Sequence, residues 1–276
     1  MLLFIVGSDN MSTTQKIIKY IAILIAFSLI FGIITGLVKI ASSLTFNDKK
    51  NTTLKDIETL DDVAILNIDC KATNINILRG DIFKAETDNK YIAVKQYNNK
   101  IIIKERNHNW FTNNNYDLNI YIPSNMTFED VNIDTGAGKI TIESLITKNL
   151  DLELGAGKTS IDELIVLNSA DIDTGAGNVM ISNGNINNLD LDLGLGKVEL
   201  TAKIMGNSKI DAGVGAVILN LIGNDSFYNL IADKGIGSIT LNDENMKEKI
   251  HYGNGHNKIE IDGGVGNINI KYITQE

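Results

Sequence analysis

The run Gly157-Lys158-Thr159 is the first stretch whose residue types suggest chemistry, because an ATPase phosphate loop ends in the same way. That loop needs the spacing G-x-x-x-x-G-K-[ST], since its first glycine begins a turn whose backbone N–H groups surround the phosphates. Five residues before Gly157 lies Leu152, so the first glycine is missing. Related phrases occur as DTGAGKITI at 134–142 and DTGAGNVMI at 173–181. A phosphate loop occurs once per domain, so we interpret the stretch as one copy of a structural repeat and expect no nucleotide.

The repeat is built around Gly-x-Gly, which recurs at intervals of 19, 20, 19, 19, 22 and 29 residues. An apolar residue lies three before each first glycine and another four after each second glycine. The middle residues are also all apolar: Ala137, Ala156, Ala176, Leu195, Val214, Ile236 and Val265.

Such regular columns are typical of stacked coils. We therefore predict an all-β fold, a β-solenoid with coils of about 19 residues. Its glycines would turn corners with the middle residue pointing inward. The long last interval indicates an insertion within 242–257.

An acidic residue lies two before each first glycine, in all seven copies: Asp134, Glu153, Asp173, Asp192, Asp211, Asp233 and Asp262. We expect this column on one outer face, with neighbours about 4.8 Å apart. Carboxylate oxygens are natural calcium ligands, so the column is a candidate calcium site. A solvated acidic face that keeps the protein soluble is the alternative, and we favour it. Lys139, Lys158 and Lys197, directly after three corners, are expected to offset part of the repulsion.

Other groups that could do chemistry are sparse. His108, His251 and His256 lie in loop-like segments without a Cys or His partner at ligand spacing, and the single cysteine, Cys70, permits no intramolecular disulfide. A uniform ladder of carboxylates offers no pair whose environments separate their pKa values, as acid–base catalysis requires. We therefore expect neither an enzyme nor a cofactor.

The N-terminal part predicts a membrane anchor. Residues 17–40, IIKYIAILIAFSLIFGIITGLVKI, are charged only at Lys19 and Lys39, and the 19 uncharged residues between them match a bilayer core. We predict a short tail at 1–16, a single transmembrane helix at 17–40 and a polar linker at 41–60. Our hypothesis is that Met11 is the true start. Lysines flank both ends of the span, so the positive-inside rule leaves its orientation open.

Period-two alternation begins at about residue 61 and predicts short strands over 61–130, ahead of the Gly-x-Gly repeat at 131–276. Beyond residue 40 the chain carries 33 acidic and 22 basic residues, a net charge of −11. A domain of this charge repels nucleic acid and anionic lipid headgroups, so we expect neither as its partner.

A predicted membrane helix, a polar linker, short strands, a strand closing in YIP at 121–123 and glycine-punctuated repeats together resemble the bacterial putative-adhesin domain family. The resemblance covers roughly residues 61–272. It implies a β-solenoid outside the cytoplasmic membrane and no enzymatic residues.

We therefore expect a single-pass protein of the cell membrane, with an extracytoplasmic C-terminal domain that acts as a surface, scaffold or stress-related interaction module. Its partner would be a protein or a cell-wall polymer. The alternative is an envelope polysaccharide-binding or -cleaving β-helix protein. The run NINIKYITQE at 267–276 is expected to form the unpaired edge of the solenoid, where a partner strand can add.

Overall fold

A computed structural model describes residues 55–57, 63–106, 116–246 and 249–274, which form strands and the turns between them. Thr52–Glu276 is one compact unit. Within the described ranges there is no helix with the length and apolar character needed to span a bilayer. The predicted tail at 1–16 and anchor at 17–40 lie outside the described residues, and of the predicted linker only β1 is described.

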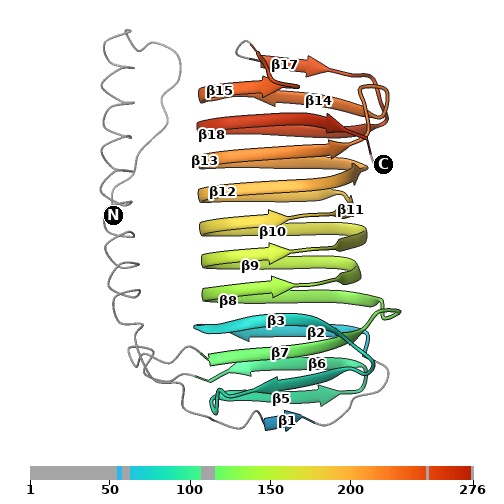
Figure 1. Cartoon of the computed structure of the whole chain (residues 1–276), viewed down its shortest axis with the longest axis vertical. Coiled ribbons are helices and arrows are strands. Elements are labelled where there is room, and N and C mark those ends of the chain that lie inside the picture. Colours follow the sequence, from blue (N-terminus) through green and yellow to red (C-terminus); the bar gives the residue numbers. More distant parts are fainter. Residues whose placement is uncertain (1–54, 58–62, 107–115, 247–248, 275–276) are drawn as a thin grey trace, which may run out of the picture. The chain divides into compact units, whose positions relative to one another are not determined.

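The strands, labelled as in Figure 1, are β1 (Lys55–Ile57), β2 (Ile65–Cys70), β3 (Thr73–Gly80), β4 (Lys84–Thr87), β5 (Ile92–Tyr97), β6 (Lys100–Glu105), β7 (Tyr116–Pro123), β8 (Phe128–Ile142), β9 (Leu145–Ile161), β10 (Leu164–Ile181), β11 (Gly184–Asn187), β12 (Leu189–Met205), β13 (Asn207–Ile222), β14 (Tyr228–Asp233), β15 (Ile236–Leu241), β16 (Glu244–Asn245), β17 (Lys249–Tyr252) and β18 (Asn257–Ile273).

One coil of the stack is a long strand bent at its Gly-x-Gly corner (Figure 1). In β9 a first arm at 145–154 leads into the corner, and a second arm at 158–161 leads away from it. Neighbouring coils pair in parallel through both arms and through the corner, so that Ala156 lies opposite Ala137 on one side and Ala176 on the other. The result is two facing layers of parallel strands joined along the glycine edge. The predicted all-β repeat fold is confirmed.

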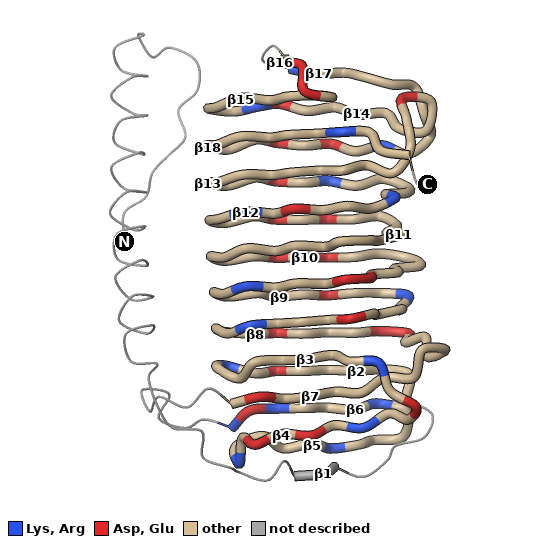
Figure 2. The backbone as a smooth tube through the Cα atoms, viewed as in Figure 1, with Lys and Arg blue, Asp and Glu red and all other residues tan. Residues whose placement is uncertain are grey.

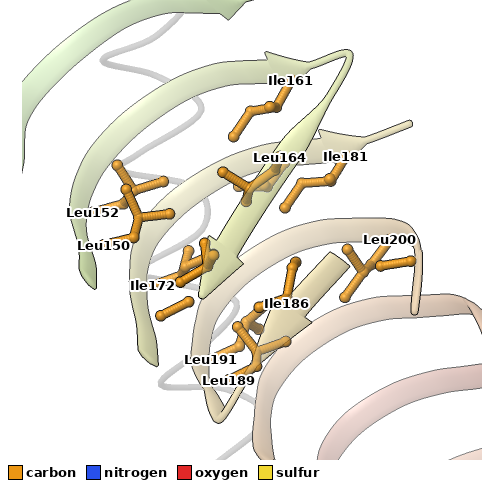
Figure 3. Packing of buried hydrophobic residues seen from close by; sticks show 14 of the residues in the cluster. Leu150, Leu152, Ile161, Leu164, Ile172, Ile181, Ile186, Leu189, Leu191 and Leu200 are labelled. Carbon is orange, nitrogen blue, oxygen red and sulfur yellow. The ribbon is translucent and has the colours of Figure 1, made fainter. Parts of the chain in front are cut away.

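The core lies between the two layers, because alternate residues of each arm point inward. In β12, Leu189, Leu191 and Leu193 are buried and the aspartates between them are exposed. Leu200, also in β12, lies on the other side of the same interior, where Figure 3 shows it among the leucines and isoleucines of adjacent coils. Burial of each such side chain stabilises the fold by roughly 1.5–3 kcal/mol.

The corner glycines are required because a side chain there would point along the stack rather than away from it. A Cβ atom on Gly155 would lie 2.1 Å from the carbonyl oxygen of Gly136 in the preceding coil. A Cβ atom on Gly196 would lie 1.8 Å from the carbonyl oxygen of Gly177, and the φ of Gly196 is +135°. Each coil therefore needs its glycines for the next coil to stack at strand spacing.

The middle residue of Gly-x-Gly does not point inward as predicted. Ala137 is exposed, Leu195 and Val214 are partly exposed, and Ile236 is 44% exposed. The reason is the second glycine, whose φ lies between +135° and +151° in six of the seven copies. This backbone conformation changes the phase of the alternation, so the next buried residue comes two after the second glycine, as at Ile140. The middle residue stays at the outer apex of the corner.

The coils do not stack in the order of the sequence. The coil formed by β2 and β3 lies between β6–β7 and β8, although it precedes all of them. At the other end β18 lies between β13 and the pair β14–β15, although it follows them. The described part of the predicted edge run 267–276, residues 267–273 in β18, is therefore not an edge strand. The ends of the stack carry short antiparallel strands, β5 at one end and β16 and β17 at the other, which leave little edge for uncontrolled pairing.

The coil β2–β3 has Lys71-Ala72-Thr73 where the later coils have Gly-x-Gly. A Cβ atom on Gly136 would lie 2.8 Å from the carbonyl oxygen of Lys71, which places this run directly before the first glycine corner. Its N–H groups are bound by a carboxylate: Lys71 N and Ala72 N donate to Glu105 Oε2 at 2.7 and 3.1 Å. Glu105 is 1% exposed and also accepts a hydrogen bond from Asn89. A buried carboxylate thus binds the N–H groups at the end of the glycine edge.

We predict that Gly196→Ala destabilises the domain by about 3 kcal/mol or more, because the new methyl group meets backbone and the φ is unfavourable for alanine. Leu195→Ala, one residue away on the outer apex, should cost about 1 kcal/mol, since the side chain is only partly buried. Urea unfolding of the full chain, followed by circular dichroism, measures both. Equal losses would contradict the proposed role of the corner.

Candidate functional site: the acidic face

The seven predicted carboxylates form one column across the stack. The register pairs neighbours as Asp134–Glu153, Glu153–Asp173, Asp173–Asp192, Asp192–Asp211, Asp211–Asp262 and Asp262–Asp233. Asp262 precedes Asp233 because β18 lies between β13 and β14. The column therefore follows the spatial order of the coils.

An eighth carboxylate, Asp69, extends the column, and the sequence analysis missed it. Asp69 lies opposite Asp134 in the pairing of β2 with β8. It precedes no Gly-x-Gly, so the criterion used for the column excluded it. The signal that could have found it is the phrase LNID at 66–69, which matches VNID at 131–134.

A second acidic column runs beside the first. Asp151, Asp171 and Asp190 are opposite one another in β9, β10 and β12, two residues before members of the first column. Residues two apart in a strand share a face, so the two columns lie side by side. We call the six carboxylates of these three coils the central acidic patch: Asp151, Glu153, Asp171, Asp173, Asp190 and Asp192. Figure 2 shows acidic segments repeated at successive levels of the stack.

Lysines form ion pairs with carboxylates on either side of the central acidic patch, and one of them, Lys209, lies opposite Asp190 in the register. Lys104 pairs with Asp69, Lys209 with Asp211 and Lys258 with Glu260. Among the described residues, no lysine or arginine forms an ion pair with the central acidic patch. Lys197 does not pair with the column as we expected, because it follows the corner and lies on the second arm. Its Nζ is 2.7 Å from Glu199 Oε2 on that same arm.

Partial burial and the crowding of like charges raise carboxyl pKa values in the central acidic patch. The pKa of Glu153 is raised chiefly by the charge of Asp134 and then by that of Asp151. The pKa of Asp171 is raised by partial burial and by Asp173, and that of Asp192 by partial burial and by Asp211. The face therefore carries repulsion that protonation or a cationic partner would relieve.

A groove accompanies the first column. It has a volume of about 530 Å³ and is lined by Asp173, Asp192, Asp211 and Asp262 together with residues of their corners. The corner glycines that line the groove have no side chain to fill the space beside the carboxylates. In the described part of the chain, no three Asp, Glu, His or Cys side chains are grouped so as to hold a metal ion. Calcium binding by the column stays a prediction.

The Toastrack DUF4097 family profile matches residues 64–271, which run from the start of the stack into β18. The chain belongs to the Toastrack DUF4097 family. This confirms the resemblance noted from the sequence.

Solved structures similar to the chain include a putative cell adhesion protein from Clostridium sporogenes, with 16% identity, 80% of this chain and 100% of that chain covered, and a TM-score of 0.28. A putative adhesin from Bacteroides fragilis has 15% identity, coverage of 82% and 98%, and a TM-score of 0.39. A putative adhesin from Parabacteroides distasonis has 14% identity, coverage of 80% and 96%, and a TM-score of 0.32. A search of proteins with curated descriptions found no match to this chain.

The remaining sequence candidates have structural positions in the Toastrack domain. Gly157, Lys158 and Thr159 lie within β9, where Thr159 is buried and no helix follows to receive a phosphate. His251 Nε2 lies 3.2 Å from Asn229 Oδ1, and His256 is exposed in the turn before β18. His108 lies outside the described residues.

We predict that Asp171→Asn and Asp192→Asn each stabilise the Toastrack domain at pH 7 by less than about 1 kcal/mol, because each removes a repelling charge at a largely exposed site. Both pKa values are raised in the folded protein, so the wild type itself gains stability as pH falls through them. The advantage of the variants should therefore shrink at acid pH. Thermal unfolding of the full chain across pH measures this.

The exposed turn residue Asp162 supplies the control, since Asp162→Asn should leave stability nearly unchanged at every pH. Loss of stability at pH 7 on neutralising Asp171 or Asp192 would contradict unrelieved repulsion.

Thermal unfolding in millimolar Ca²⁺, Mg²⁺ or Na⁺ at matched ionic strength tests calcium binding. If specific sites exist, the unfolding midpoint in Ca²⁺ is higher than the midpoint in Mg²⁺ or Na⁺. The double variant Asp192→Asn with Asp211→Asn would then lose this increase. We expect equal midpoints, as for the solvated face that we favour.

Proposed function

We propose that this chain is a single-pass protein of the bacterial cell envelope, anchored by residues 17–40, with its Toastrack domain outside the cytoplasmic membrane. In this proposal the domain is an adhesin-like surface or scaffold module. Its acidic face contacts a protein or cell-wall polymer that carries positive charge. The parallel register of the coils is the observation that carries the proposal, because it gives the face a regular set of carboxylates, six of which form no ion pair with a lysine or arginine among the described residues.

The arrangement of the face supports contact with an extended partner. The central acidic patch occupies the first arms of three consecutive coils, so its side chains project from one face of the stack. Opposite charge on a partner would steer association and fix its position along the column. Carboxylates in equivalent environments favour binding over acid–base catalysis, which needs two groups with separated pKa values.

The anchor is supported by the sequence. The stretch at 17–40 has the length and apolar character of a single span, and the charge of the domain beyond it disfavours contact with anionic lipid. The acidic face would then be directed at other components of the envelope.

One experiment tests location and surface together. Intact cells producing the full chain are treated with a membrane-impermeant amine crosslinker. We expect crosslinked products of the wild type, and their loss in the triple variant Asp151→Asn, Asp171→Asn and Asp190→Asn, because these three exposed carboxylates belong to the face.

A matched control removes the same charge from other surfaces, through Asp81→Asn, Asp162→Asn and Glu244→Gln, all at exposed positions. It should retain the crosslinks. Crosslinking only after the cells are lysed would exclude the extracytoplasmic location, and equal crosslinking of both triple variants would exclude the acidic face as the contact surface.

A further inference from the structure

The strands after β13 form a C-terminal module, residues 228–273. Within the described strands, β14 pairs with β17 and β18, β15 pairs with β16 and β18, and none of these four pairs with β1 to β13. Only β18 pairs with the body of the stack, through β13. The module is therefore internally paired, and its only strand pairing with the body among the described strands is that of β18 with β13.

This joint reproduces the contact between two ordinary coils. β18 matches β13 in register from Asn207–Lys258 to Ile222–Ile273, including the corner glycines. Its inward residues Ile259, Ile261, Ile268 and Ile270 are at most 2% exposed. A Cβ atom on Gly266 would lie 1.6 Å from the carbonyl oxygen of Gly215, so the backbones fit closely at this corner too. The β13 edge therefore selects a strand with the spacing and glycines of β18.

The connection between body and module is short and crosses one level of the stack. Gly223 to Phe227 join β13 to β14, and β18 occupies the level between these two strands. The chain must therefore place β14 two levels away, roughly 10 Å at strand spacing, before β18 exists to fill the gap. Gly223 has a φ of +141°, and Asn224 Oδ1 accepts hydrogen bonds from Ser226 and Phe227. This segment can serve as a hinge.

We propose that two copies of this chain exchange their C-terminal modules, so that β18 of each copy pairs with β13 of the other. Each β13 edge remains open until a β18 strand arrives, and the strand of a second copy is chemically identical to its own. Every contact at the joint is re-formed in the exchanged dimer, including the hydrogen bond from Ile204 N to Tyr228 Oη and that from Lys258 N to the Gly206 carbonyl. Only the hinge changes its conformation, as in other domain-swapped dimers.

Concentration decides between the two closed forms. Closure within one chain is favoured in dilute solution, because the tethered module has an effective concentration in the millimolar range. Folding at high concentration, or side by side on a surface, allows a second copy to compete. Once formed, the exchanged dimer persists, since separating the copies breaks the full β13–β18 pairing.

A disulfide across the joint tests the exchange. Asn220 and Lys271 are register partners in β13 and β18, so the double variant Asn220→Cys with Lys271→Cys links a module to the body that holds it. The full chain is refolded at low and at high concentration, oxidised, separated by size and run on a denaturing gel without reductant. We expect a covalent dimer in the dimer fraction, and more of that fraction after refolding at high concentration.

The control pair lies wholly within the body, where Thr201 and Asn220 are partners in β12 and β13. Thr201→Cys with Asn220→Cys should run as a monomer on the denaturing gel even from the dimer fraction. Covalent monomers from Asn220→Cys with Lys271→Cys in that fraction, or the absence of a dimer fraction at high concentration, would overturn the proposal.

A second measurement does not depend on disulfide geometry. Two differently tagged copies of the wild-type chain are either refolded together or refolded separately and then mixed. Exchange predicts mixed-tag dimers only after refolding together, because folded chains must first open the joint. Mixed dimers that form equally fast in both cases would show association through folded surfaces and overturn the exchange.

Discussion

The fold depends on how closely two backbones approach at a parallel corner. At Gly155, Gly196 and their equivalents the Cα–Cβ direction runs along the stack, and a methyl group would occupy the position of the neighbouring carbonyl oxygen. Glycine is the only residue without that atom, so each coil keeps strand spacing through its bend only with glycines there. The in-register layers and the continuous core follow from this spacing.

The same register imposes a cost on the outer surface. Because the coil sequence repeats, the register places residues of the same charge next to one another. The carboxylates before the corners therefore repel one another along the column. The isoleucine and leucine layers inside the stack offset this repulsion through burial. Lysines relieve it at Asp69 and Asp211, while the central acidic patch retains its charge. Stability from the interior thus allows a concentrated charge on the exterior.

The period of the sequence was sufficient to predict an all-β stack and the column from Asp134 to Asp262, because both depend on spacing alone. The direction of Ala137 and Ile236 was not predictable in this way, since it depends on the φ of the following glycine. The position of β18 was also missed. Sequence order and spatial order usually agree in solenoids. No local pattern in residues 223–256 indicates that β14 leaves a gap of one strand next to β13, which β18 then fills. Asp69 was missed because the corner of its coil has no glycine pair. Glu105 binds the backbone N–H groups at that corner instead.

The enclosed position of β2 has a mechanical consequence. Tension applied through the chain ahead of β1 first loads the three-residue pairing of β1 with β4. Beyond β1 it reaches β2, which is hydrogen-bonded to β6 on one side and to β8 on the other. A strand at the edge of a sheet can be peeled from one neighbour, one bond after another. Here two rows of bonds share the load, and the pull is transmitted directly to β8 and the regular coils beyond it. The stack is thus built to resist extraction from the end at which the chain enters it.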